Sequence, residues 1–165
     1  MAKESSFDVV STVDIQEVDN AFQQAKKELS QRYDLKDSGA SISFDKQGKS
    51  ITVKAPSDFV AGQVTDIIGT KLVKRGIDMG AVKWGASQPS AGQSVTKTAN
   101  LVDGIDKDVS GKINKDIKAQ KLKVKVQIEG DKLRVSSASR DTLQDVIAFL
   151  KNQDYGQPLQ YVNYR

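Results

Sequence analysis

The chain has 165 residues, of which 38% are hydrophobic and 28% charged, and its formal net charge is +4. This length fits one domain or two small ones of about 80 residues each. No uncharged apolar run approaches the roughly 20 residues that a membrane span needs. The polar first residues do not match a signal peptide, so we expect a soluble, cytoplasmic protein.

Cysteine and histidine are both absent from the chain. Their absence excludes thiol nucleophiles, disulfides, zinc sites built on these residues, and catalytic triads with a histidine base. The glycine loops of nucleotide hydrolases and of dinucleotide-binding folds are not found either. We therefore expect no enzymatic activity, no metal site and no cofactor.

The positive charge is confined to the second half of the chain. Residues 1–89 hold 12 basic and 12 acidic residues, whereas residues 90–165 hold 13 and 9, which accounts for the whole net charge of +4. Within 107–134, nine basic residues stand against four acidic ones. Such asymmetry favours polyanionic partners.

The first elements predicted along the chain are a strand and a helix. Phe7–Val10 alternates apolar and polar residues as a strand does. Asp14 followed by Glu17 forms a capping-box signal, which predicts a helix over about 15–32.

A hairpin and a second helix follow. Strands at 42–44 and 51–53 flank a turn that contains Gly48. Ser57 caps the second helix and Gly76 ends it. Its apolar residues, which we expect to face the core, are Phe59, Val64, Ile67, Ile68 and Leu72.

A fourth strand at 79–84 completes this unit, and the small, polar residues 85–94 indicate a linker or a long loop. A second unit then begins with a weak strand at 95–97. Its first helix has apolar positions at Leu101, Ile105, Val109, Ile113 and Ile117.

The rest of the second unit repeats the plan of the first. Strands at 124–128 and 133–135 form a hairpin, Ser139 caps the last helix, and a strand at 159–164 closes the sheet. The hairpin strand at 133–135 lies 82 residues after the one at 51–53, so one supersecondary unit is used twice.

Each unit has the order βαββαβ, with apolar alternation on one sheet face only. This is the ferredoxin-like plan, in which both helices cover one face of an antiparallel sheet. The predicted fold class is α+β with two such halves, residues 1–89 and 90–165.

Alternation in the second hairpin assigns side chains to the two sheet faces. Those expected to face the helices are Val124, Val126, Ile128, Leu133 and Val135. Those expected on the open face are Lys123, Lys125, Gln127, Lys132, Arg134 and Ser136. Like charges on adjacent strands destabilise the sheet, so a function or an acidic neighbour must compensate. The face is either a phosphate-binding surface or a solvated, lysine-rich one.

Other candidate residues are weaker. RNA-binding modules of similar topology stack bases on aromatic residues of two central strands, and the hairpin strands here carry none. Tyr161 or Tyr164 could stack a base. The favoured interpretation is that one of them completes the core and the other covers a sheet edge. Lys74 and Arg75 either complement the dipole of the second helix or bind an anion.

Seven short segments, in order along nearly the whole chain, resemble the bacterial YajQ family. They are Ser6–Ser11, Leu29–Asp34, Lys71–Arg75, Lys121–Val124, Leu133–Ser136, Ser139–Gln144 and Tyr161–Arg165. The ordered set is specific, whereas no single segment is. The resemblance implies ferredoxin-like halves that exchange their N-terminal strands, with Phe7–Val13 completing the sheet of the second half.

The resemblance also implies a non-enzymatic nucleotide- or RNA-binding protein, with a tRNA-like RNA, GTP or cyclic di-GMP as ligand. The alternative is a protein–protein adaptor that contacts a transcription regulator through the open sheet face. We expect a monomer. The candidate nucleotide or RNA contacts are Arg32, Lys74, Arg75, Lys123, Lys125, Arg134, Arg140, Tyr161 and Arg165.

Overall fold

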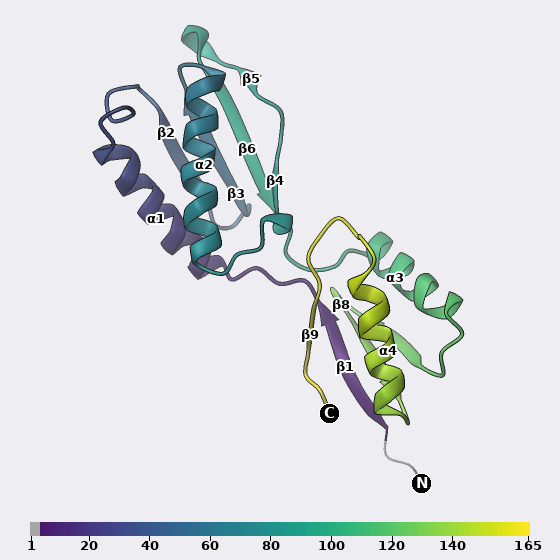
Figure 1. The fold of residues 1–165 in the computed structure, drawn as a ribbon. Helices are drawn as coiled ribbons and strands as arrows, with labels where there is room; N and C mark the ends of the chain where they lie inside the picture. The colour runs from purple at the N-terminus through teal and green to yellow at the C-terminus, as the bar shows by residue number, and fades with distance from the viewer. Residues whose placement is uncertain (1–3) are drawn as a thin grey trace. The chain divides into compact units, whose positions relative to one another are not determined.

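The computed structural model describes residues 4–165 and divides them into two compact units. Unit 1 combines the residues up to Thr12 with Asp103–Arg165, and unit 2 is Val13–Val102. Each unit has an antiparallel sheet with two helices on one face (Figure 1). The predicted α+β class with two ferredoxin-like halves is confirmed. Among residues 4–165, no helix combines the length and apolar character needed to cross a membrane.

Unit 2 contains helices α1 (Ile15–Gln31) and α2 (Asp58–Lys74). Its strands are β2 (Ser41–Asp45), β3 (Ser50–Ala55), β4 (Val82–Trp84), β5 (Gln88–Pro89) and β6 (Val95–Leu101). The sheet order is β2-β3-β6-β4, and β5 also pairs with β6. The expected linker at 85–94 therefore contributes a short strand.

Unit 1 contains helices α3 (Lys107–Ala119) and α4 (Arg140–Lys151). Its strands are β1 (Ser5–Val10), β7 (Lys125–Glu129), β8 (Lys132–Ser137) and β9 (Gln160–Val162). The sheet order is β7-β8-β1-β9. Every neighbouring pair is antiparallel, as in one ferredoxin-like half.

The two units exchange one strand each. β1 lies between β8 and β9, and β6 takes the equivalent position between β3 and β4. The apolar side chains explain this pairing, because Phe7 and Val9 of β1 are buried in the core of unit 1. Ala99 and Leu101 of β6 are buried in the core of unit 2. The exchange implied by the resemblance is thus present.

The exchange moves the boundaries expected at residues 89 and 90. The chain passes between units after Thr12 and again after Val102. The strand assigned from the sequence to the second half, residues 95–97, is part of β6 in unit 2. The repeat seen in the sequence predicts that each unit is one continuous segment of the chain. The observed strand pairing instead builds unit 1 from two separate segments.

The helix starts follow the predicted caps, with one difference. The side chains of Asp14, Ser57 and Ser139 accept hydrogen bonds from backbone N–H groups in the first turns of α1, α2 and α4. The helix expected from Leu101 onward begins at Lys107, after the cap residue Asp106. Leu101 pairs within the sheet of unit 2, so it is not available to that helix.

Two residues assigned to the core lie outside it. Phe59 is 75% exposed and Ile128 is 46% exposed. Phe59 precedes the buried Ile68 by nine positions, which is half a turn out of phase in an α-helix. Ile128 lies near the end of β7, the edge strand of its sheet. The other predicted core residues of α2 are buried.

Replacing Phe7 by alanine tests the strand exchange. Phe7 is fully buried in unit 1, so Phe7→Ala should lower the free energy of unfolding of that unit by about 3–5 kcal/mol. Amide hydrogen exchange should accelerate in Asp103–Arg165 and remain unchanged in Val13–Val102. Val18→Ala, in the core of unit 2, is the control with the opposite pattern. Acceleration in unit 2 alone after Phe7→Ala would contradict the pairing of β1.

Candidate functional site

The open face of the unit 1 sheet carries polar side chains in cross-strand rows. Because Leu133 and Val135 of β8 are buried against the helices, their neighbours in sequence lie on the open face. The first row, which we call the basic row, consists of Lys125, Ser136, Ser6 and Arg165. The second row consists of Gln127, Arg134, Asp8 and Val162.

Asp8 is the acidic neighbour that the crowded cations require. Its side chain is only 2% exposed. Its carboxylate accepts hydrogen bonds from Asn163 Nδ2 at 2.8 Å, Arg134 Nε at 3.2 Å and Lys132 Nζ at 3.4 Å. Burial alone raises the pKa of the Asp8 carboxyl, but these hydrogen bonds and the charge of Lys132 outweigh it. The pKa therefore lies below its ordinary value.

The network divides the predicted cations into two groups. Arg134 pairs with Asp8 and also lies 3.6 Å from Glu129, so it stabilises the sheet. Among residues 4–165, Lys125 and Arg165 have no ion-pair partner. Lys123 is exposed just before β7, and its carbonyl oxygen accepts a hydrogen bond from Ser137 Oγ at 2.9 Å. The cations of this sheet that a ligand can reach are thus Lys125 and Arg165 of the basic row, with Lys123 beside them.

A β-bulge follows β9. Val162 pairs with Asp8. Arg165 exchanges backbone hydrogen bonds with Ser6, at 2.9 and 3.2 Å. Two residues therefore lie between these pairs on the C-terminal segment and only one on β1, which defines a bulge. Asn163 has a φ of 58° there, in the left-handed region that asparagine tolerates better than most residues.

The bulge redirects the side chains that follow it. Tyr161 and Tyr164 both contact Phe7, with ring centroids 6.1 and 6.2 Å away, so both lie on the helix side of the sheet. Tyr161 packs against the core, and burial raises the pKa of its hydroxyl. Tyr164 stays 60% exposed. Of the two tyrosines considered from the sequence, the one accessible to a ligand is therefore Tyr164 and not Tyr161, which stands among the predicted contacts.

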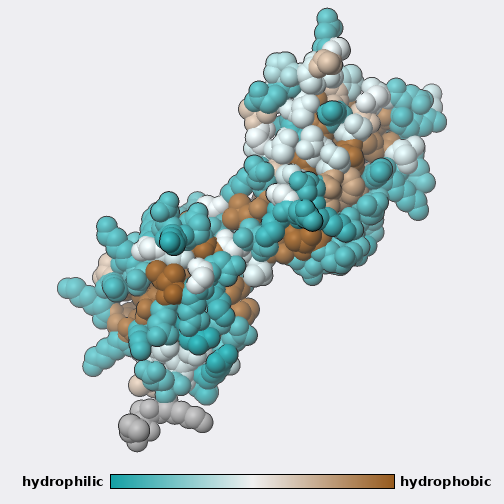
Figure 2. Space-filling view, turned by 180° about the vertical axis from the view of Figure 1, so that it is seen from behind, coloured by the Kyte–Doolittle hydropathy of each residue, from teal (hydrophilic) through white to brown (hydrophobic). Residues whose placement is uncertain are grey.

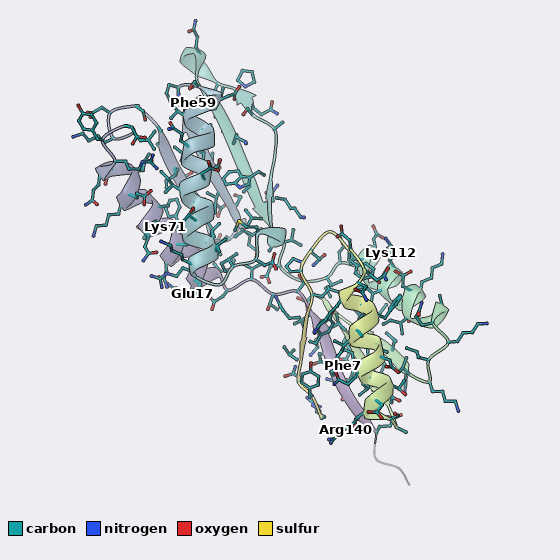
Figure 3. All side chains as sticks on the ribbon, viewed as in Figure 1. Phe7, Glu17, Phe59, Lys71, Lys112 and Arg140 are labelled. Atoms are coloured by element: carbon teal, nitrogen blue, oxygen red, sulfur yellow. The ribbon has the colours of Figure 1, made fainter. Side chains whose placement is uncertain are left out.

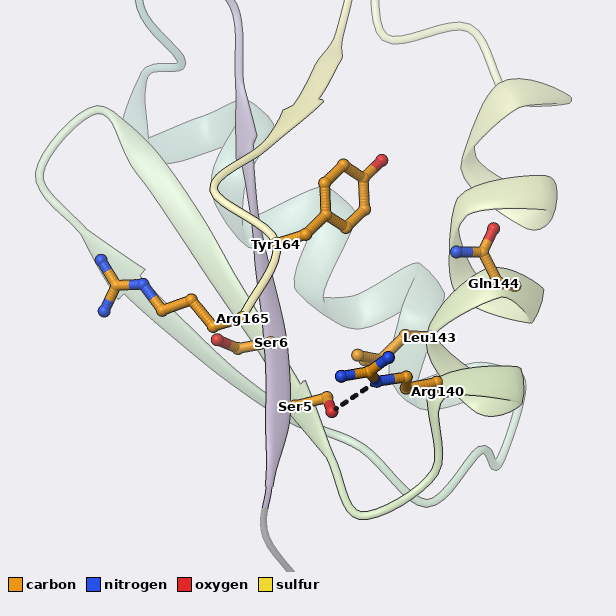
Figure 4. A pocket seen from close by; sticks show the side chains of 7 residues that line it. All are labelled: Ser5, Ser6, Arg140, Leu143, Gln144, Tyr164 and Arg165. Atoms are coloured by element: carbon orange, nitrogen blue, oxygen red, sulfur yellow. Dashed lines mark hydrogen bonds between the residues drawn. The ribbon is translucent and has the colours of Figure 1, made fainter.

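Tyr164 lines a pocket of about 250 Å³ between β1 and the start of α4. The pocket residues are Ser5, Ser6, Arg140, Leu143, Gln144, Tyr164 and Arg165 (Figure 4). Arg140 Nε donates to Ser5 Oγ at 3.4 Å. In Figure 4, Arg140, Gln144 and Tyr164 face the space between β1 and α4, whereas the Arg165 side chain extends on the other side of β1.

The pocket and the basic row therefore meet at one end of β1. Ser5 and Ser6 are consecutive, so their side chains lie on opposite faces of the sheet. Tyr164 and Arg165 do the same on the neighbouring segment. At this end of the sheet, an aromatic group and a serine hydroxyl on the helix side lie close to a serine hydroxyl and an unpaired guanidinium on the open side. Such a set can bind phosphates and stack a planar group.

Three predicted contacts lie in unit 2, where acidic neighbours hold two of them. Arg32 donates two hydrogen bonds to Asp34, at 2.8 and 3.0 Å, which lower the pKa of the Asp34 carboxyl. Arg75 lies 3.6 Å from Glu17. Lys74 is exposed and lines a groove of about 400 Å³ between α1 and α2. These three residues belong to unit 2, whereas the basic row belongs to unit 1.

The open sheet face of unit 2 has a different chemistry. Its central row consists of Ser43, Thr52 and Thr98, which are hydroxyl residues in register. Seen from behind, unit 2 shows many pale atoms of intermediate hydropathy, and unit 1 more strongly hydrophilic ones (Figure 2). The central row of this face is thus uncharged, whereas both rows of unit 1 carry cations.

The sequence alone did not single out Asp8, Ser5, Ser6 or Gln144, and it left open which of Tyr161 and Tyr164 is accessible. Asp8 offered one signal, because it is a charged residue inside an alternating strand. The role of Tyr164 offered none, since simple alternation places it on the opposite face from Tyr161 and only the bulge brings them to the same side.

Replacing Asp8 by asparagine tests the charge network. Because the folded-state pKa of Asp8 lies below its ordinary value of 3.8, its stabilisation is complete above that value and is lost as the pH falls through the folded-state pKa. Asp8→Asn should abolish this acid dependence. At neutral pH it should lower the free energy of unfolding by about 1–3 kcal/mol, because Lys132 and Arg134 lose their counter-charge.

Urea unfolding across the acidic range measures both effects. Asp19→Asn is the control, because Asp19 pairs with the exposed Lys46 on the surface of unit 2 at 3.0 Å, and exposed pairs contribute little. Equal losses in the two variants would show that Asp8 is an ordinary surface carboxylate.

A family model described as "Nucleotide-binding protein YajQ-like" matches residues 5–165. A nucleotide-binding protein of Desulfitobacterium hafniense is 47% identical over the full length of both chains. A nucleotide-binding protein of Chloroherpeton thalassium is 44% identical, again over the full length of both chains. One from Heliobacterium modesticaldum is 46% identical over all of this chain and 99% of its own length.

Proposed function

The chain belongs to the YajQ-like family, and on that premise we propose that it binds RNA or a dinucleotide through unit 1, without a chemical step. The phosphates contact the basic row, and a base enters the pocket beside Tyr164. The relatives named above are called nucleotide-binding proteins, and the geometry of unit 1 supports the same activity for this chain.

The basic row is the observation that carries the proposal. Lys125 and Arg165 stand at its two ends without acidic partners, and the hydroxyls of Ser136 and Ser6 lie between them. Three strand spacings separate the two ends, which is about 14 Å. This span suits more than one phosphate group. The adjacent row is neutralised by Asp8, so the free positive charge is concentrated at the row that borders the pocket.

The size of the pocket supports a ligand that extends beyond it. Pockets that enclose a whole small ligand measure about 300–1,000 Å³, and this one measures about 250 Å³. One base fits this space, stacked on Tyr164 and within reach of the Gln144 amide. The sugar and phosphates then pass over the edge at Arg165 to the basic row. A single-stranded RNA or a cyclic dinucleotide such as cyclic di-GMP meets this requirement better than a mononucleotide.

Lysines on α3 strengthen the positive field of unit 1. Lys107, Lys115 and Lys118 are exposed, and none has an ion-pair partner among residues 4–165. Unpaired charges of one sign raise the local concentration of anions and the rate of their association. This contribution does not depend on the nucleotide sequence.

A double variant of the basic row tests the phosphate contacts. Lys125→Ala with Arg165→Ala should weaken binding of a fluorescently labelled tRNA, measured by anisotropy at several salt concentrations. The slope of log affinity against log salt should fall in magnitude by about 1.4 to 1.8, because two phosphate contacts are lost. Lys54→Ala with Lys83→Ala removes the same charge from exposed positions in unit 2 and should change the slope little.

Unlabelled cyclic di-GMP and GTP as competitors then identify the ligand class. An unchanged affinity in the basic-row variant would remove this surface from consideration. No binding at low salt would leave the adaptor interpretation as the better one.

The variant Tyr164→Ala tests the pocket independently of charge. Stacking on an aromatic residue contributes about 1–3 kcal/mol per base, so the affinity should fall roughly tenfold or more. The salt slope should stay at the wild-type value, because no phosphate contact is removed. A changed slope with an unchanged affinity would contradict the assignment of Tyr164 to base stacking.

A further inference from the structure

The outward face of α2 differs from that of every other helix in residues 4–165. The exposed faces of α1, α3 and α4 consist mainly of charged and amide residues. The outward stripe of α2 contains Phe59, Gly62, Asp66, Thr70 and Val73. Phe59 is 75% exposed and Val73 is 57% exposed. This stripe thus places two large apolar side chains in solvent, and exposed apolar side chains gathered on one face mark an interaction surface.

A hollow of about 780 Å³ lies beside the C-terminal half of α2. Its apolar lining comes from Val73, Met79 and Trp84, and Lys74 lies at its border. Gly69 also lines it, and Met79 Sδ lies 3.8 Å from where a Cβ of residue 69 would be. The hollow is therefore an apolar depression with a charged rim.

Phe59 and the hollow lie at opposite ends of the same helix. Figure 3 shows Phe59 at the N-terminal end of α2, far along the helix from Lys71. Phe59 and Val73 are 14 positions apart, which is about 21 Å along the axis and nearly the same side of the helix. A surface with a projecting ring at one end and a matching depression at the other is complementary to itself under a two-fold rotation.

We propose that the outward face of α2 binds the same face of a second copy of this chain, with the two helices antiparallel. Phe59 of each copy then enters the hollow of the other, opposite Val73. The same alignment brings Asp58 of one copy opposite Lys74 of the other, twice, and sets the helix dipoles antiparallel. This charge complementarity favours a second copy over an unrelated partner. The contact lies in unit 2 and does not rest on the nucleotide-binding proposal.

The glycines of α2 support a close approach of the second helix. A glycine inside a helix costs about 1 kcal/mol relative to alanine. A Cβ at Gly62 would meet no atom within 4 Å, so packing inside the chain does not require glycine there. In the antiparallel pairing Gly62 lies opposite Thr70 of the other copy, and two small residues there let the backbones come close.

Asp66 opposes the contact. It lies at the middle of α2, so its two copies come near the two-fold axis and repel each other. Two substitutions on this face should therefore have opposite effects. Removing the Phe59 ring should weaken the dimer, and removing the Asp66 charge should strengthen it.

Sedimentation of the full chain from low to high micromolar concentration tests the proposal. The wild-type chain should dimerise, and Phe59→Ala should raise the dissociation constant by about tenfold or more, as expected for a buried aromatic anchor. Tyr33→Ala is the control, because Tyr33 is 91% exposed in the same unit and lies outside α2. Asp66→Asn should lower the dissociation constant.

Gly62→Ala separates association from folding. Its higher helix propensity should raise the melting temperature of the monomer, while the added methyl group should weaken the dimer. A wild-type chain that stays monomeric throughout the concentration range would overturn the proposal. A dimer that Phe59→Ala and Gly62→Ala leave unchanged would overturn it as well.

Discussion

The buried carboxylate of Asp8 is the constraint on which unit 1 depends. β1 occupies the middle of a sheet whose neighbouring strand carries Lys132 and Arg134 on the same face. Without the Asp8 carboxylate beside them, these two cations would repel each other along one face of β8, with no counter-charge on the neighbouring strand. One acidic residue, supplied by a strand from the far end of the chain, both fixes the register and sets which cations remain free. On the open face, the basic row therefore keeps unpaired positive charge, whereas Asp8 neutralises the cations of the adjacent row and stabilises the sheet.

The candidate site depends on the same strand. Ser5 and Ser6 at the start of β1 contribute to two faces, and the segment beside them turns Tyr164 inward through one inserted residue. The bulge is a local change of register. It places the ring of Tyr164 on one side of the sheet and the guanidinium of Arg165 on the other. This arrangement needs no cleft between domains, no metal and no loop longer than the bulge itself.

Much of the fold followed from the sequence, because helix caps and apolar periodicity act over a few residues. Asp14, Ser57 and Ser139 fixed helix starts in this way. Strand pairing is a long-range choice, so the place of β6 could not be derived from its own residues. Phe59 was wrongly assigned to the core because it was grouped with the other apolar residues of the helix. Its position, half a turn away from Ile68, places it on the opposite side. The site was only partly predictable, since Lys125, Arg140 and Arg165 follow from charge, whereas the bulge depends on backbone geometry.

The exchanged strands also set the order in which the protein can fold during synthesis. Unit 2 is one continuous stretch, Val13–Val102, and all of its strands have been made before α3 begins. β1 is made before all of unit 2, whereas its partners β8 and β9 are made after it. The nascent chain carries an apolar strand, with Phe7 and Val9, that stays unpaired until β8 has been made. The early Lys, Glu and Asp residues around this strand keep it charged during that interval, which lowers its tendency to pair with other chains.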